Sequence, residues 1–337
     1  MSKAKPLLGI TMGDPAGVGP EICLDLLNHF ESAQASVPII FGDAECLRRA
    51  AQATGKPFNA PILALSDLES LPLRQLEVPS VLDFANVDFA DFTPGEVTAK
   101  TGQASFEYII EAIRLANNKA IDAVVTAPIN KYALSLAGIN YPGHTEILKE
   151  RTDSKEVTMM LTADNISCSL VTTHIGLADV PKAISTKRIS QVIRQTEKAM
   201  RSIKNKKVRL AVLGLNPHAG ESGLFGNDEE SLLITPAIQK AVSQGMDVIG
   251  PLPADTAFIK DNLESIDAFI CMYHDQGLIP VKLLAFDSAV NVTLGLPILR
   301  TSVDHGTALG IAWKGLAKSS SLVEAVRLAC LMSAHQS

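Results

Sequence analysis

Short apolar runs alternate along the chain with longer segments of helical periodicity, and this alternation constrains the fold more than any other sequence feature. The runs are typical of buried strands and cover residues 38–41, 123–126, 167–173, 208–215, 268–273 and 290–294. Amphipathic helices are predicted at residues 103–117 and 186–203. Strands that alternate with helices form mostly parallel sheets that are buried on both faces. The sequence therefore predicts an α/β fold.

The chain is long enough for two domains, because single hydrophobic cores rarely grow beyond about 250–300 residues and it has 337 residues. It contains no internal repeat and no clear linker. Residues 126–131 (TAPINK) end a predicted strand at a proline, which favours a crossing point there. We expect a first domain of residues 1–128 and 286–337 and a second of residues 129–285.

Charge and cysteine content exclude several classes of protein. The formal net charge is -6, which would repel a nucleic-acid backbone. Five widely spaced cysteines form neither a disulfide framework nor a Cys-x-x-Cys metal site, as expected of a cytoplasmic protein. No signal sequence and no charge-free run of the ~18 residues that span a bilayer is present. We expect neither a nucleic-acid nor a membrane partner.

A glycine-rich segment, residues 13–21 (GDPAGVGPE), lies between an apolar run and a helical pattern over residues 22–30. It suggests a phosphate-binding turn, but Ile22 stands where the dinucleotide fingerprint needs a third glycine, and no Gly-Lys-Ser/Thr follows. Pro20 and Glu21 are also ordinary residues for the start of a helix. Considered alone, the segment favours a tight structural turn.

Three of the seven histidines share one sequence context. His174, His218 and His274 each follow an apolar run and precede a glycine by two or three residues. Ligands of open α/β sheets bind at the carboxyl ends of strands, and three imidazoles meeting there would suit a divalent metal. Their wide spacing matches no local metal-binding motif, so hydrogen-bonded loop histidines remain an alternative.

Two further segments carry residues suited to anions. His144 and Thr145 open a helical pattern, where imidazole, hydroxyl and backbone amides can meet an anion, although Thr145 can also serve only as a cap. Lys282, Asn291 and Arg300 lie in a largely apolar region. A phosphate or carboxylate would pair with these cations, and so would internal acidic residues.

The glycine-rich segment, the histidine segments and the anion-binding segments described above follow one another along the chain. Their order and residues resemble those of the PdxA family, the 4-hydroxythreonine-4-phosphate dehydrogenases. They span nearly the whole chain, and the most specific are residues 214–221 (GLNPHAGE) and 273–277 (YHDQG). The resemblance implies a two-domain α/β/α fold similar to the isocitrate and isopropylmalate dehydrogenases, without a Rossmann fingerprint. It also implies a homodimer with the active site at the subunit interface. The sequence itself shows no apolar stripe that would predict a dimer.

The resemblance further implies roles for individual residues. His174, His218 and His274 would bind a divalent metal (zinc, magnesium or cobalt), shared across the dimer. His144, Thr145, Lys282, Asn291 and Arg300 would bind the substrate. NAD or NADP would contact Gly295, Leu296, Ser302, Asp304, His305, Gly306 and Thr307. The sequence departs from the family pattern at Gly310 and Trp313, which leaves the choice between NAD and NADP open.

These residues suit oxidation of a secondary alcohol β to a carboxylate. A metal lowers the pKa of the alcohol while a hydride passes to the nicotinamide, and the resulting β-keto acid can then lose carbon dioxide. Lys131, Asp255 and Asp275 are candidate bases, and Asp275 can instead orient His274. The related 4-phospho-D-threonate and 4-phospho-D-erythronate dehydrogenases, the dihydrodiol dehydrogenases, and a metal-dependent aldolase or phosphatase remain alternatives, as does a catalytically inactive phosphate-binding module.

Overall fold

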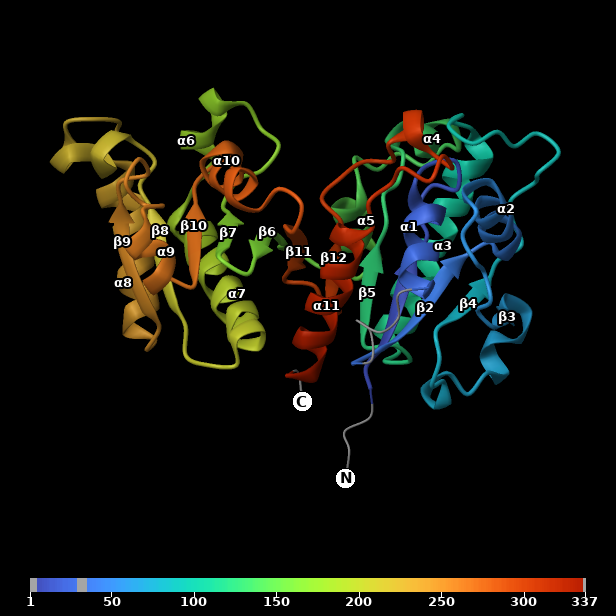
Figure 1. Cartoon of the computed structure of the whole chain (residues 1–337). Helices are drawn as coiled ribbons and strands as arrows, with labels where there is room; N and C mark the ends of the chain where they lie inside the picture. Colours follow the sequence, from blue (N-terminus) through green and yellow to red (C-terminus); the bar gives the residue numbers. More distant parts are fainter. Residues whose placement is uncertain (1–4, 29–34, 336–337) are drawn as a thin grey trace. The chain divides into compact units, whose positions relative to one another are not determined.

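The computed structural model describes residues 5–28 and 35–335, and its architecture confirms the predicted α/β fold (Figure 1). The chain divides into two compact units: unit 1 comprises Met1–Val157 and Leu296–Ser337, and unit 2 comprises Thr158–Gly295. The boundaries therefore differ from those expected at 128/129 and 285/286. Helices α4 (Lys131–Leu136) and α5 (His144–Arg151) pack against α3 (Ala99–Asn117) of unit 1, and this packing moves the first boundary.

All strand pairs of the unit 1 sheet are parallel. The strands, in sheet order, are β3 (Ile62–Ala64), β4 (Ser80–Asp83), β2 (Val37–Gly42), β1 (Leu7–Thr11), β5 (Ala123–Thr126) and β12 (Arg300–Ser302). The register places Thr126 between Thr11 and Ser302. Three hydroxyl side chains therefore lie in adjacent positions at the carboxyl ends of three neighbouring strands.

Two groups of helices pack on this sheet. Helix α1 (Gly19–Asn28) contacts α2 (Ala44–Thr54) and α11 (Ser320–Ala334), whereas α3 contacts β1, β2 and β5. The predicted helix over residues 22–30 lies in α1 as far as residue 28, and its last two positions fall outside the described residues.

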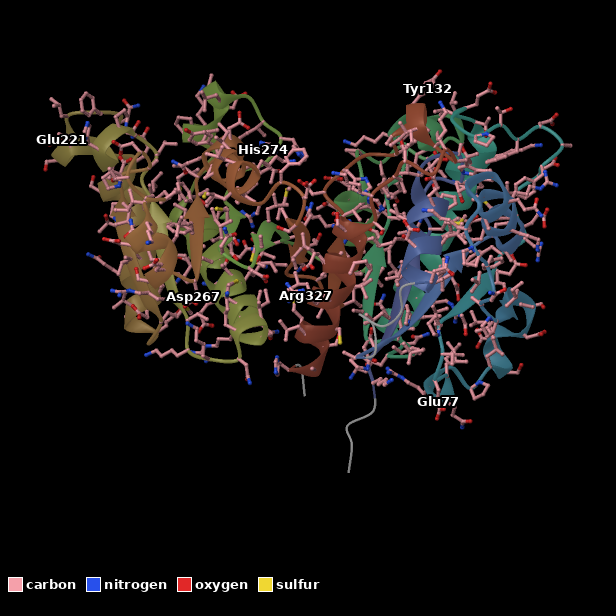
Figure 2. All side chains as sticks on the ribbon, in the orientation of Figure 1. Glu77, Tyr132, Glu221, Asp267, His274 and Arg327 are labelled. Carbon is pink, nitrogen blue, oxygen red and sulfur yellow. The ribbon has the colours of Figure 1, made fainter. Side chains whose placement is uncertain are left out.

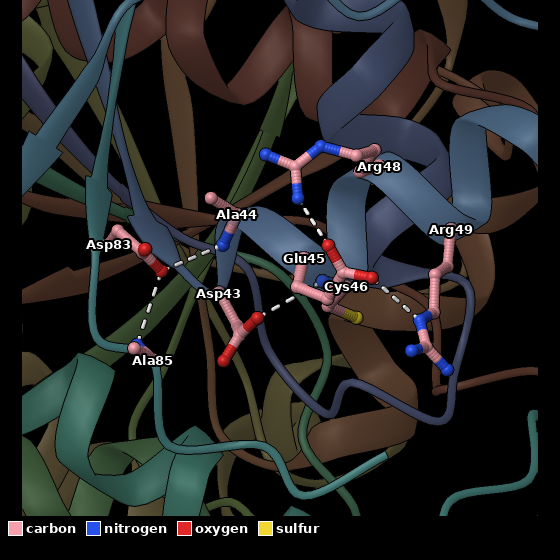
Figure 3. Close-up of polar contacts among 8 residues, drawn as sticks. All are labelled: Asp43, Ala44, Glu45, Cys46, Arg48, Arg49, Asp83 and Ala85. Atoms are coloured by element: carbon pink, nitrogen blue, oxygen red, sulfur yellow. Dashed lines mark hydrogen bonds and ion pairs between the residues drawn. The ribbon is translucent and has the colours of Figure 1, made fainter.

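Two aspartates fix the start of α2 at the carboxyl ends of β2 and β4 (Figure 3). Asp43 caps the helix by accepting a hydrogen bond from the Cys46 backbone N–H at 3.0 Å. Asp83 accepts bonds from the backbone N–H groups of Ala44 at 2.9 Å and Ala85 at 3.1 Å. These contacts tie the helix directly to the strand ends.

The unit 2 sheet is mixed. Its strands, in sheet order, are β11 (Val290–Leu294), β6 (Thr158–Ala163), β7 (Ile166–Leu170), β10 (Ala268–Cys271), β8 (Arg209–Leu213) and β9 (Asp247–Leu252). Strand β6 pairs antiparallel with both β7 and β11, and the remaining pairs are parallel. The antiparallel pair of β6 and β11 places residues 286–295 in unit 2, beyond the expected boundary.

Helices α7 (Thr186–Lys204) and α10 (His274–Ala285) pack on this sheet, and α8 (Thr235–Ser243) contacts α7. The core under α10 includes Phe269, Leu213 and Leu278. Shorter helical elements are η2 (Leu65–Ser70), η3 (Leu73–Gln75), η4 (Leu177–Asp179), α6 (Val180–Ala183), η5 (Pro217–Gly223), η6 (Glu230–Ile234), α9 (Lys260–Ser265) and η7 (Leu309–Ile311). Over residues 5–28 and 35–335, no helix combines the length and apolar character that a bilayer crossing requires.

Candidate active site

Two of the three histidines come together at the carboxyl end of the unit 2 sheet. Pairing between β7 and β10 continues past the strands, because the backbone N–H of Val171 donates to the Cys271 carbonyl at 2.9 Å and that of Thr172 to the Met272 carbonyl at 3.2 Å. The segments that follow bring the rings of His174 and His274 to a centroid distance of 5.6 Å. The imidazole of His174, which is exposed, and that of His274, which is half-buried, therefore lie next to each other.

The residues around His274 hold its ring in a defined orientation. Its Nδ1 lies 2.7 Å from Oδ1 of Asp275, so that Nδ1–H can donate to the carboxylate and leave the lone pair on Nε2 for a metal. The buried amide of Gln276 accepts from the Met272 backbone N–H at 2.6 Å and donates to the Gly214 carbonyl at 2.8 Å. This amide links the His274 turn to the end of β8.

His218 lies in η5, and its side chain is 62% exposed. Its ring stacks on Phe225 at a centroid distance of 6.4 Å, and its Nδ1 lies 3.8 Å from the Glu221 carboxylate. Figure 2 shows Glu221 and His274 at one end of unit 2 and Asp267 lower in the unit. Within the described part of a single chain, no three His, Cys, Asp or Glu side chains gather around a common metal position.

Unit 1 contains a second group of predicted site residues. Arg300 is 3% exposed, and its Nη2 donates to the Thr126 hydroxyl at 2.7 Å. Burial lowers the pKa of the Arg300 guanidinium to about 9, which leaves it charged at neutral pH. Burial, and then the charges of Arg300 and Lys131, holds the pKa of His144 well below its usual value. His144 is therefore a neutral imidazole beside two cations.

The other predicted binding residues are distributed over both units. Thr145 lies in the first turn of α5, next to His144. Lys282, on α10, places its Nζ 5.5 Å from the centroid of the Phe286 ring. Within the described residues, the buried Oδ1 of Asn291 and Nε2 of His144 have no hydrogen-bond partner. Such orphaned buried atoms are suited to a polar ligand.

The candidate bases differ in their surroundings. Asp275 contacts His274, which suits it to orient the ring. Lys131 is exposed at the start of α4, and its charge acts on His144. Asp255 is exposed in the loop before α9. These placements leave the base assignment as a prediction.

The glycine-rich segment is a close-packed turn. The Val18 backbone N–H donates to the Thr307 carbonyl at 3.0 Å, and a Cβ atom on Gly17 would lie 2.9 Å from that oxygen. A Cβ atom on Gly19 would overlap the Met12 carbonyl oxygen. The indole of Trp313 donates to the Pro15 carbonyl at 3.2 Å. These contacts account for the glycines and the tryptophan as packing residues.

The residues predicted to bind the NAD or NADP cofactor are only partly buried. Ser302 and Thr307 are buried, whereas Gly295, His305 and Gly306 are exposed, and Asp304 and Leu296 are intermediate. A Cβ atom on Gly306 would meet no atom within 4 Å. The loop is therefore anchored through Thr307 and open beside Gly306.

We expect the stability of the protein to fall between about pH 4 and pH 6 because of Asp14, whose Oδ1 accepts from the Ala16 backbone N–H at 2.9 Å. Burial raises its pKa to about 6, outweighing the opposing hydrogen bonds from Ala16 and Thr101. Its contribution is complete below pH 3.8, the usual pKa, and is lost as the pH rises through about 6. Urea unfolding across this range should show a loss of up to about 3 kcal/mol, absent in Asp14→Asn. An identical slope in the variant would contradict the assignment.

Helix α10 carries an apolar stripe that was not predicted from the sequence. Ile279, Leu283 and Phe286 occupy one face at intervals of four and three residues, and Leu283 is 81% exposed. The spacing was visible in the sequence, but Gly277 and Pro280 interrupt the helical pattern. An exposed stripe of this kind is typical of an interaction surface.

Comparison with known proteins identifies the family. The model of the family described as "Pyridoxal phosphate biosynthetic protein PdxA" matches residues 34–329. The chain belongs to the PdxA family. It is 44% identical to a 4-hydroxythreonine-4-phosphate dehydrogenase of Geobacter metallireducens (99% of this chain, 97% of that protein) and 41% identical to a D-threonate 4-phosphate dehydrogenase of Cupriavidus necator (97% of each).

A solved structure of the PdxA family shares the fold over almost the full length of both chains. The crystal structure of a 4-hydroxythreonine-4-phosphate dehydrogenase from Klebsiella pneumoniae superimposes with a TM-score of 0.86 at 38% identity, covering 99% of each chain. The named relatives are thus dehydrogenases of two different phosphorylated hydroxy acids.

Proposed function

We propose that this PdxA-family chain is an NAD(P)- and divalent-metal-dependent 4-hydroxythreonine-4-phosphate dehydrogenase that acts in the cytoplasm. It would oxidise 4-phosphooxy-L-threonine to 2-amino-3-oxo-4-phosphooxybutanoate, which decarboxylates to 3-amino-2-oxopropyl phosphate. The observation that carries the proposal is the pair of imidazoles, His174 and His274, 5.6 Å apart at the carboxyl end of the sheet. Family membership supports the choice of reaction.

The donor set fits a divalent metal. Two neighbouring imidazoles, one of them oriented by a carboxylate, are good ligands for zinc or cobalt. We assign His218 as the third ligand, supplied by the second subunit of a homodimer, because its ring is exposed. When bound, such a metal supplies a Lewis acid for the alcohol oxygen and for the charge that develops during decarboxylation.

The exposed stripe of α10 supports the homodimer. Ile279 and Leu283 lie on the helix that begins at His274, and Phe286 is its C-cap. Burying such side chains against a second copy is favourable at roughly 25 cal/mol per Å² of apolar surface. The same contact would bring a second chain to the helix that carries His274.

The substrate has two anionic groups, a carboxylate and a phosphate, and the chain supplies cations for both. We assign Arg300, His144 and Thr145 of unit 1 and Lys282 and Asn291 of unit 2 to substrate binding. Arg300 can form paired hydrogen bonds with either anion, and the neutral His144 can donate one. Fixing both ends would orient the carbon that loses the hydride.

The nicotinamide cofactor would accept that hydride. We assign Gly295, Leu296, Ser302, Asp304, His305, Gly306 and Thr307 to its binding. The open space beside Gly306 fits close approach of a ligand to the backbone, and Asp304 offers a carboxylate to a ribose hydroxyl. Lys131 and Asp255 are the candidate bases that would take the proton of the alcohol, and Asp275 is assigned to orienting His274.

A second function is favoured by the relative from Cupriavidus necator, which is named for D-threonate 4-phosphate. 4-Phospho-D-threonate, and similarly 4-phospho-D-erythronate, carries the same carboxylate, secondary alcohol and phosphate. Oxidation at carbon 3 would use the same metal and anion-binding residues. The two functions differ in the group at carbon 2.

The deciding experiment measures nicotinamide reduction by the purified protein after chelator treatment. 4-Phosphooxy-L-threonine and 4-phospho-D-threonate are each offered with NAD or NADP, with and without added zinc, cobalt or magnesium. Metal-dependent turnover of the L-amino acid supports the proposal, and preference for the D-threonate phosphate supports the second function. Release of inorganic phosphate or carbon–carbon cleavage without nicotinamide reduction would contradict both and indicate a phosphatase or aldolase.

A further inference from the structure

The loop that carries His218 is left-handed through five consecutive residues. The φ angles of residues 218–222 run from 43° to 84°, and only Gly220 among them lacks a side chain. Left-handed backbone costs roughly 1–2 kcal/mol for each residue other than glycine. A run of this kind persists only where surrounding contacts hold it.

Glu230 contacts the segment that leads into this loop. Its side chain is almost completely buried, at 6% exposure, at the start of η6. Its Oε1 accepts from the backbone N–H groups of Leu215 and Asn216, both at 2.8 Å. The side-chain amide of Asn216 lies 3.3 Å from Oε1 and 3.1 Å from Oε2. One carboxylate thus binds the chain two to three residues before His218.

The same carboxylate also determines the shape of the loop after His218. A Cβ atom on Gly220 would lie 2.7 Å from Oε2 of Glu230, so only glycine lets the loop close over the carboxylate. Glu229 adds a second carboxylate, which accepts from the Asn216 amide at 2.9 Å and the Asn227 backbone N–H at 2.7 Å. Glu230 is therefore in contact with the loop on both sides of the histidine.

We propose that Glu230 is a positioning residue that holds the left-handed loop so that His218 can ligate the metal. This inference rests on the proposed function, which makes His218 a metal ligand. A carboxylate suits the task because it accepts from several N–H groups at once, and such charge-assisted bonds are about twice as strong as neutral ones. In Glu230→Gln, an NH₂ group would replace Oε2 and would face the NH₂ group of Asn216. Both groups are donors, so the hydrogen bond that Oε2 accepts from Asn216 would be lost.

The test uses the full-length protein after chelator treatment, titrated with Zn²⁺ by calorimetry and with Co²⁺ by its visible absorption. Glu230→Gln is expected to weaken metal binding about 10- to 100-fold, as does loss of partners that orient metal ligands. It should also speed backbone hydrogen exchange in residues 214–223 of the metal-free protein. Glu264→Gln, an exposed position on α9, is the matched control and should retain wild-type affinity and exchange.

The outcomes separate this inference from the proposed function. His218→Ala should weaken metal binding, and if it does so while Glu230→Gln retains wild-type affinity, Glu230 has no positioning role. A lower Tm with unchanged affinity would likewise overturn the inference, because it indicates a purely structural residue. If neither His174→Ala nor His218→Ala affects metal affinity, the metal assignment fails and the inference fails with it. Asn216→Ala, a milder change, should weaken binding about fivefold and serves if Glu230→Gln does not fold.

Discussion

His274→Ala is expected to lower kcat/KM for the phosphorylated substrate at least about 1,000-fold. A Lewis acid contributes several kcal/mol to the stabilisation of the transition state, and each 1.4 kcal/mol is worth a factor of ten. His274 is one of two neighbouring imidazoles, so its replacement removes the ring whose centroid lies 5.6 Å from that of His174. The measurement is nicotinamide reduction at saturating metal, together with the metal dissociation constant. His335→Ala, on an exposed histidine at the end of α11, should change neither value.

Mixing inactive variants tests whether the third ligand comes from a second subunit. His174→Ala and His218→Ala should each be inactive alone. In a mixed dimer, one of the two sites has all three histidines, so an equal mixture should recover about a quarter of wild-type activity. Failure to recover any activity after verified subunit exchange would mean that one subunit supplies both His174 and His218 to the same site. Wild-type turnover by His274→Ala would contradict the metal assignment altogether.

The elements with the clearest pattern in the sequence are also those that the structure confirms most closely. Residues 123–126 and 290–294 were predicted as strands and are strands β5 and β11 with the same bounds. Helix α7 differs from its prediction by one residue at its end. These segments have uninterrupted apolar or amphipathic periodicity, so local pattern and tertiary packing agree.

Among the elements that were not predicted, β12, α10 and the loop of His218 have a conflicting or weak local signal. Strand β12 contains Arg300, a charged residue that a buried strand rarely holds. Helix α10 contains Gly277 and Pro280, which oppose a helix in isolation and are tolerated here because the helix packs on β6, β7 and β10. The left-handed run around His218 shows only Gly220 as a sequence signal, since its shape depends on contacts with Glu230, ten residues further along the chain.

The context of the histidines predicted part of the candidate site. His174 and His274 follow adjacent strands, so parallel pairing was enough to bring them together. His218 follows β8, on the far side of β10, and its exposed loop carries it elsewhere within the chain. No rule of strand order specifies where such a loop points, and a site that a second subunit would complete leaves no pattern in one sequence.

Arg300→Ala is expected to lower kcat/KM about 30- to 5,000-fold while the protein stays folded. The guanidinium is buried and charged, and truncating one member of a buried, hydrogen-bonded charge pair costs about 2–5 kcal/mol. Arg300→Lys retains the charge but loses the planar fork, so it should recover only part of the activity. Thr126→Val removes the hydroxyl that accepts from Nη2 and should reduce kcat/KM about tenfold or less.

Steady-state kinetics with phosphorylated and unphosphorylated substrates then identify the anion that Arg300 binds. A loss confined to the phosphorylated substrate indicates the phosphate, and an equal loss with both substrates indicates the carboxylate. Activity of Arg300→Ala within about threefold of wild type, with an unchanged Tm, would remove Arg300 from the substrate site.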